Sequence, residues 1–171
     1  MSTDEVLAVL DRLAEAGVEP WVEGGWGVDA LVGAETRPHE DLDLVLSRRQ
    51  WDSAVEALRA FGLGVDEDRS QPPVSLVLRK DTVVVDLHPV VLDDRGNGWQ
   101  PHGPRAWALY PAEGFEGRGT IAGRVVRCIS QEVQLRHHLG YEWDENDVKD
   151  MHLLAERFGL ALPPSKYEEV S

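Results

Sequence analysis

The chain of 171 residues carries 17 Lys and Arg against 31 Asp and Glu, which gives a formal net charge of −14. An apolar share of 42% is ordinary for a globular domain with its own core, whereas the acidic balance argues against a polynucleotide partner, which needs a basic face. No apolar run approaches the roughly 20 residues that span a bilayer.

Further features of the composition bear on partners and compartment. An acidic surface attracts metal ions or cationic small molecules, although the excess acid could equally serve solubility alone. The N-terminus is polar and acidic, and the single Cys128 leaves no intramolecular disulfide. We therefore expect a cytoplasmic protein without signal peptide, membrane anchor or bound nucleic acid.

Apolar periodicity and turn residues predict alternating helices and strands in the first part of the chain. In order, they indicate a helix over 2–17, a strand at 21–22, a glycine turn at 24–25, a helix over 26–31, a strand over 42–46 and a helix over 47–61. Next come strands over 74–78 and 83–91, an exposed loop over 93–105, a hairpin over 121–126, and helices over 131–139 and 146–158. This pattern is α+β, with a mixed sheet first and helices last.

Two acids mark the strand over 42–46 and its approach. Asp41 and Asp43 are two residues apart, so their side chains share one face of a strand, while Leu42 and Leu44 face the core. Such a pair is costly unless a cation neutralises it, and carboxylate oxygens suit Mg²⁺. Strand-end acids facing solvent are the alternative.

Asp86 is a single acid inside the apolar run Val83-Val84-Val85-Asp86-Leu87. It is either a hydrogen-bonded core acid or part of a site. Together with Asp41 and Asp43, it could hold two metal ions about 4 Å apart, an arrangement that clamps the attacking and leaving oxygens of a phosphoryl displacement.

A phosphate-binding segment precedes these acids. Gly24 and Gly25 follow a strand and lead into a helix, which allows close backbone approach and presents amides at a positive helix end. Arg37 and His39 could contact phosphate oxygens. Each has a structural alternative: glycine pairs are common in turns, and His39, like His88, is more often structural than catalytic.

These motifs resemble the polymerase β-like nucleotidyltransferase superfamily, in which a Gly-Gly pair precedes an acid-x-acid strand and a third acid. Gly-Gly-Trp-Gly-Val-Asp at 24–29 and Thr-Arg-Pro-His-Glu-Asp-Leu-Asp-Leu at 36–44 are similar to the branch of aminoglycoside and lincosamide nucleotidyltransferases. The later segment 137–150 also resembles that branch. The likeness spans roughly residues 20–160.

The resemblance implies a mixed sheet of about five strands flanked by helices in a core over 1–128, followed by a small helical region over 129–171. It implies that Asp41, Asp43 and Asp86 bind Mg²⁺, with two ions expected, and that Asp86 is the general base. ATP or another nucleoside triphosphate would donate its nucleotide to a hydroxyl of a small molecule, an aminoglycoside or a lincosamide, and pyrophosphate would leave. A homodimer is also implied as plausible.

The acceptor site is the least defined part of the prediction. Tyr141 and Glu142 are candidate acceptor-binding residues, and the following acids Asp144, Glu145 and Asp147 either line that site or form a solvated helix start. Competing interpretations are the same chemistry on an acceptor that is not an antibiotic, a non-catalytic nucleotide-binding module, and a plain metal-binding protein.

Overall fold

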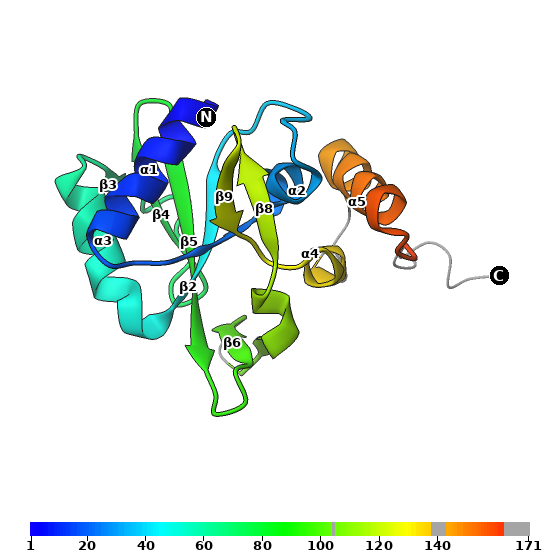
Figure 1. The fold of residues 1–171 in the computed structure, drawn as a ribbon. Helices are drawn as coiled ribbons and strands as arrows, with labels where there is room; N and C mark the ends of the chain where they lie inside the picture. The colour runs from blue at the N-terminus through cyan, green and yellow to red at the C-terminus, as the bar shows by residue number, and fades with distance from the viewer. Residues whose placement is uncertain (104, 138–142, 163–171) are drawn as a thin grey trace.

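A computed structural model describes residues 1–103, 105–137 and 143–162. Its centre is a mixed sheet with the strand order β1-β2-β5-β4-β3 (Figure 1). The five strands are β1 Trp21–Glu23, β2 Leu42–Ser47, β3 Gly64–Val65, β4 Leu76–Lys80 and β5 Val83–Leu92. β2 and β5 run parallel, and the other neighbouring pairs run antiparallel. The expected α+β class, with a mixed sheet of about five strands, is confirmed.

Within the described residues, five α-helices surround this sheet. They are α1 Thr3–Glu15, α2 Gly24–Val32, α3 Trp51–Ala60, α4 Gln131–His137 and α5 Glu145–Phe158, and a 3-10 turn over Arg48–Gln50 precedes α3. Figure 1 shows α1 and α3 together at one side of the sheet and α2, α4 and α5 grouped at the other. None of the helices in the described ranges is long and apolar enough to cross a membrane.

The alternation of side chains along β2 gives the sheet one face packed by leucines and an opposite face that carries Asp43 together with the buried Val45. Leu42, Leu44 and Leu46 are fully buried and pack in the core cluster that α1 and α3 complete. Asp43, between them, lies on the opposite face of the strand. The strand period of two therefore places the acid away from the core, as the sequence predicts.

Two short strands complete the sheet region. β6 Gly98–Pro101 pairs with the end of β5 and with β7 Trp107–Tyr110. The prediction of an exposed loop over 93–105 is therefore wrong for Gly98–Pro101. A four-residue strand with a terminal glycine and proline has little intrinsic strand propensity. Its stability comes from pairing on both edges and from burial of Gln100, which the local sequence does not reveal.

The hairpin expected over 121–126 is confirmed as β8 Arg118–Ile121 and β9 Arg124–Arg127, with Ala122 and Gly123 at the turn. β8 packs closely on α2: a Cβ at Gly119 would lie 2.2 Å from the Ala30 carbonyl oxygen. α2 itself begins at Gly24, so the two glycines form its first turn instead of a turn before it. The expected helix over 131–139 is described to His137, and its remaining residues lie outside the described ranges.

Candidate active site

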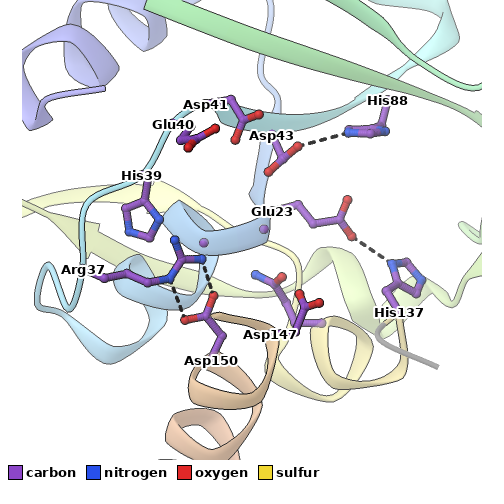
Figure 2. A pocket seen from close by; sticks show the side chains of 13 residues that line it. Glu23, Arg37, His39, Glu40, Asp41, Asp43, His88, His137, Asp147 and Asp150 are labelled. Carbon is purple, nitrogen blue, oxygen red and sulfur yellow. Dashed lines mark hydrogen bonds and ion pairs between the residues drawn. The ribbon is translucent and has the colours of Figure 1, made fainter. Parts of the chain in front are cut away.

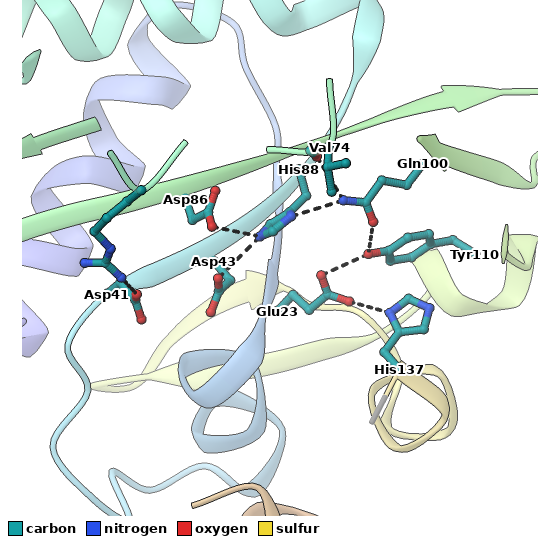
Figure 3. A network of polar contacts seen from close by, with 10 residues as sticks. Glu23, Asp41, Asp43, Val74, Asp86, His88, Gln100, Tyr110 and His137 are labelled. Atoms are coloured by element: carbon teal, nitrogen blue, oxygen red, sulfur yellow. Dashed lines mark hydrogen bonds and ion pairs between the residues drawn. The ribbon is translucent and has the colours of Figure 1, made fainter. Parts of the chain in front are cut away.

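Asp43 and Asp86 form the centre of the site. They are register partners on the parallel strands β2 and β5, so their side chains project from the same face of the sheet. His88, two residues after Asp86, joins them: its Nε2 lies 3.4 Å from Asp43 Oδ1 and 3.7 Å from Asp86 Oδ2 (Figure 3). One ligand atom from each of these three residues lies within 4.8 Å of the other two, close enough to share a metal ion.

Asp41 lies immediately before β2 and lines the same cleft as Asp43. Its Oδ2 accepts a hydrogen bond of 2.7 Å from Arg69 Nη2. Among the described residues, Asp41 is therefore beside the compact group of Asp43, Asp86 and His88 instead of within it. An Arg69 side chain that is 44% exposed can release this carboxylate at little cost.

The electrostatics of the acid pair fit a cation. Burial, together with the charges of Asp41 and Asp86, raises the pKa of Asp43, although the hydrogen bond from His88 opposes that shift. Asp86 Oδ1 is buried and has no hydrogen-bond partner in the described part of the chain. A buried carboxylate oxygen without a partner is costly, and a divalent cation would satisfy it.

His88 begins a chain of polar contacts that leads away from the acids (Figure 3). Gln100 Nε2 lies 3.1 Å from His88 Nδ1, and Gln100 Oε1 lies 3.1 Å from the Tyr110 hydroxyl. That hydroxyl is also 3.1 Å from Glu23 Oε2, and Glu23 Oε1 lies 2.9 Å from His137 Nδ1. The chain of contacts therefore joins β5, β6, β7, β1 and α4 behind the acid pair.

The charges in this network shift two further groups. Burial lowers the pKa of His88, but the hydrogen bond and charge of Asp43 and the charge of Asp86 outweigh it, and the pKa rises to about 9. Burial of Glu23 raises its pKa, but the hydrogen bond and charge of His137 outweigh burial, and the net shift is downward. Glu23 is therefore held as a carboxylate at the end of β1.

A cleft of about 330 Å³ opens over the acids and the start of α2. Six of its 13 lining residues are Asp or Glu: Glu23, Glu40, Asp41, Asp43, Asp147 and Asp150. The first N–H groups of α2 face no acceptor within the helix, and Glu23 at the N-cap makes no side-chain capping bond. The cleft thus combines a carboxylate cluster with the positive end of a helix.

Gly24 is required by its contact with Asp43. Its φ of +61° is left-handed, and a Cβ there would lie 2.1 Å from Asp43 Oδ2. Gly25 makes room in the same way for the segment between α2 and β2. A Cβ at Gly25 would lie 2.3 Å from His39 Nδ1 and 2.7 Å from Arg37 Nη2. The glycine pair therefore lets the side chains of Asp43, His39 and Arg37 close onto the start of α2.

His39 and Arg37 are each held by an acid from another element, and Figure 2 shows the pair of Arg37 with Asp150. His39 Nε2 lies 2.5 Å from Asp29 Oδ2, and both side chains are only 3% exposed. Arg37 Nε and Nη2 donate to Asp150 Oδ1 and Oδ2 at 3.1 and 2.6 Å. Since Asp150 is on α5, the C-terminal helix takes part in building the cleft.

The structure thus brings together most of the residues that the sequence singles out. Gly24, Gly25, Arg37, His39, Asp41 and Asp43 line the cleft, and Asp86 joins them through Asp43 and His88. Tyr141 and Glu142 lie outside the described residues. Asp147 completes the capping box of α5 with Asp144, as the helix-start alternative predicts, and it also lines the cleft.

Sequence reasoning missed the roles of Glu23, His88, His137 and Asp150. For His88 a signal was available: it is two residues from Asp86 in a strand and so shares its face. Glu23 directly precedes the glycine pair, which is a weaker signal. His137 and Asp150 lie within the segment 137–150 that resembles the family, but they reach the site only through tertiary packing of α4 and α5.

Comparisons with known proteins identify the family of the chain. Residues 5–154 match the family model described as aminoglycoside-2''-adenylyltransferase. The chain is 29% identical over 147 residues to a lincosamide resistance protein of Staphylococcus haemolyticus, covering 86% of this chain and 90% of that protein. It is 25% identical over 175 residues to a 2''-aminoglycoside nucleotidyltransferase of Klebsiella pneumoniae, covering 93% of this chain and 90% of that protein.

Among solved structures, the chain is similar to the lincosamide antibiotic adenylyltransferase LnuA bound to lincomycin. The TM-score is 0.78 at 28% identity, and the match covers 90% of this chain and 96% of that one. The family match, spanning most of the chain, confirms the resemblance drawn from the glycine pair and the three acids. The chain belongs to the aminoglycoside-2''-adenylyltransferase family.

Proposed function

We propose that the protein is a Mg²⁺-dependent nucleotidyltransferase that moves the nucleoside monophosphate of ATP, or of another nucleoside triphosphate, to a hydroxyl of a small molecule and releases pyrophosphate. The observation that carries the proposal is the pair of facing carboxylates, Asp43 and Asp86, with one buried oxygen left without a partner in the described residues. This carboxylate pair lies beside the N-terminus of α2, where free backbone N–H groups favour phosphate binding.

In this proposal, Asp43 and Asp86 hold the metal, and Asp41 joins them after leaving Arg69; two ions are expected. The bound metal would polarise the α-phosphoryl group and offset the charge that develops on the leaving pyrophosphate. The raised pKa of Asp43 and the unpartnered Asp86 Oδ1 support the assignment, because a cation would relieve both.

The triphosphate would lie over the start of α2. The backbone N–H groups of Gly24 and Gly25 would donate to its oxygens, since the glycines leave room for close approach. Arg37 and His39, which close the same end of the cleft, would add charge-assisted hydrogen bonds. These contacts would hold the α-phosphorus over the acids, in line with the acceptor hydroxyl.

Asp86 would take the proton of the attacking hydroxyl as general base, provided that the acceptor oxygen comes within hydrogen-bond reach of its carboxylate. His88 contacts both Asp43 and Asp86, so it would help to hold the two carboxylates in their facing orientation.

The acceptor proposed is an antibiotic of the aminoglycoside or lincosamide class. The acidic lining of the cleft favours a polycationic aminoglycoside, whereas the likeness to a lincosamide resistance protein favours a lincosamide. Tyr141 and Glu142 remain proposed acceptor contacts, and a homodimer remains a proposal.

Pyrophosphate release tests the function directly. Purified protein with ATP and Mg²⁺ is given a panel of aminoglycosides and lincosamides, and Asp43→Asn is the control. Release that depends on one acceptor class and is lost in the variant would support the reaction and identify the class. Release from Asp43→Asn equal to wild type would contradict the central premise.

A further inference from the structure

Arg37 is fixed from three sides by the protein. Asp150 binds it in a bidentate ion pair, with Nη2–Oδ2 at 2.6 Å and Nε–Oδ1 at 3.1 Å, and Nη1 donates to the Pro38 carbonyl at 3.3 Å (Figure 2). Gly25 packs against Arg37 Nη2, because a Cβ at position 25 would lie 2.7 Å from that nitrogen. An arginine side chain is long and flexible in general, so this degree of restraint is notable.

Asp150 is buried for this contact. Its side chain is 7% exposed, although it belongs to α5, a helix whose other buried residues are apolar: Met151, Leu154 and Ala155. A carboxylate on the inner face of a helix is costly unless it is paired. The bidentate geometry with Arg37 supplies that partner, and it joins α5 to the loop that leads into β2.

The pair leaves part of the guanidinium available to a ligand. Of the five N–H groups of an arginine, three are engaged by Asp150 and Pro38 within the described residues. The other two belong to Nη1 and Nη2, and Arg37 lines the cleft together with Gly24 and Gly25 at the start of α2. Donors held in a fixed orientation bind an anion with less loss of side-chain entropy.

We propose that Asp150 is a positioning residue for the nucleotide site: through its ion pair it orients Arg37 so that the two remaining N–H groups bind the phosphates of the triphosphate. Asp150 itself lines the cleft, but in this assignment it acts through Arg37 and does not bind the triphosphate. The inference rests on the proposed function, because it takes the cleft at α2 as the triphosphate site. On this inference, α5 contributes to nucleotide binding as well as to the packing of the fold.

A purely Coulombic view gives the opposite expectation, and this makes the proposal testable. The negative charge of Asp150 lies beside Arg37 and opposes an incoming polyanion, so its removal should then tighten binding. If orientation dominates, removal should weaken the binding of a triphosphate and leave a ligand with one phosphate largely unaffected. The direction in which the triphosphate affinity changes therefore distinguishes the Coulombic view from the positioning role.

The experiment compares Asp150→Asn with wild type by calorimetric titration of α,β-methylene-ATP and of AMP, each with Mg²⁺. Glu156→Gln, on the exposed face of α5, is the matched control. We expect Asp150→Asn to weaken α,β-methylene-ATP about tenfold, the range of one charge-assisted hydrogen bond, and AMP less than about twofold. The control should match wild type.

Tighter binding of α,β-methylene-ATP, or an equal loss for both nucleotides, would overturn the positioning role. Should Asp150→Asn fail to fold, Arg37→Gln is compared with Arg37→Gln/Asp150→Asn, which leaves neither charge unpaired. Equal affinities of these two variants for α,β-methylene-ATP are expected, and a further loss in the double variant would contradict the proposal. Absence of triphosphate binding by wild type would instead overturn the proposed function itself.

Discussion

Asp43 on β2 and Asp86 on β5 are register partners on two parallel strands, and both carboxylates lie on the sheet face opposite Leu42 and Leu87, which fill the core. Two anions in direct opposition destabilise the folded chain unless a cation offsets their charge, and His88 does so only in part, because the pKa of Asp43 remains raised. This relationship connects the stability of the protein to its proposed chemistry.

The first prediction concerns metal binding. Mg²⁺ or Mn²⁺ should raise the unfolding temperature of the metal-free wild type by roughly 5–10 °C at a hundredfold excess over Kd. Asp43→Asn should lose this response, and its metal-free form should unfold at or above the wild-type temperature because one of the opposed charges is gone. Thermal unfolding followed by circular dichroism measures both effects.

Asp52→Asn, an exposed acid in the first turn of α3, is the control and should respond to the metal as wild type does. An identical metal response of Asp43→Asn and wild type would show that the ion binds elsewhere.

The second prediction separates backbone strain from a clash at the site. Gly24 and Gly17 have similar positive φ values of +61° and +71°, but only Gly24 has a neighbour in the way of a Cβ, namely Asp43 Oδ2 at 2.1 Å. Alanine at either position should cost about 1 kcal/mol of unfolding free energy from left-handed strain. Gly24→Ala should in addition lower kcat/KM about a hundredfold, because it displaces the carboxylate.

Kinetics and urea unfolding of the two variants test this difference. A Gly24→Ala variant that retains full kcat/KM would mean that the position of Asp43 is not critical.

The third prediction is a pH dependence of stability. The pKa of Glu23 is lowered from the ordinary 4.5 by His137, which outweighs burial, so its carboxylate stabilises the fold above that pH. Glu23→Gln should cost about 1–3 kcal/mol of unfolding free energy at pH 7. The difference from wild type should shrink as the pH falls below 4.5, because Glu23 of the unfolded chain then takes up its proton, and it should vanish below the lowered pKa of Glu23 in the folded protein.

Urea unfolding at pH 7 and at pH 4 measures the difference, with the exposed Glu56→Gln on α3 as the control. A penalty that is constant with pH would contradict the stabilising role of the charge.

The fourth prediction concerns Cys128. The thiol is fully buried, and burial raises its pKa to about 12, with only partial opposition from Arg118. A thiol reagent at pH 8 should therefore leave the native protein unmodified and react with one equivalent after unfolding in urea. Rapid stoichiometric labelling of the native protein would show that β9 opens locally.

The part of the site that the sequence predicts is the part that depends on local geometry. Asp41, Leu42 and Asp43 show the strand period of two, and an acid within an apolar strand such as Asp86 has few ways to be accommodated. The glycine pair could also be recognised from the sequence, because a helix that begins directly after a strand is a local feature.

The part that could not be predicted depends on contacts between distant elements. Arg37 meets Asp150 across 113 positions, and Glu23 meets His137 across 114. Neither pairing follows from spacing, because each requires the packing of α4 and α5 on α2. β6 was missed for a related reason: its four residues are stabilised by their neighbours more than by their own propensity.

The ion pair between Arg37 and Asp150 also has a consequence during synthesis. A ribosome that has delivered residues 1–128 has produced Asp43, Asp86 and the strands that carry them, but not α5. The nascent chain therefore has the opposed acids before it has the contact that restrains Arg37. The nucleotide end of the cleft can therefore be completed only after α5 has been synthesised and has packed on α2, and ligand binding should follow formation of the sheet.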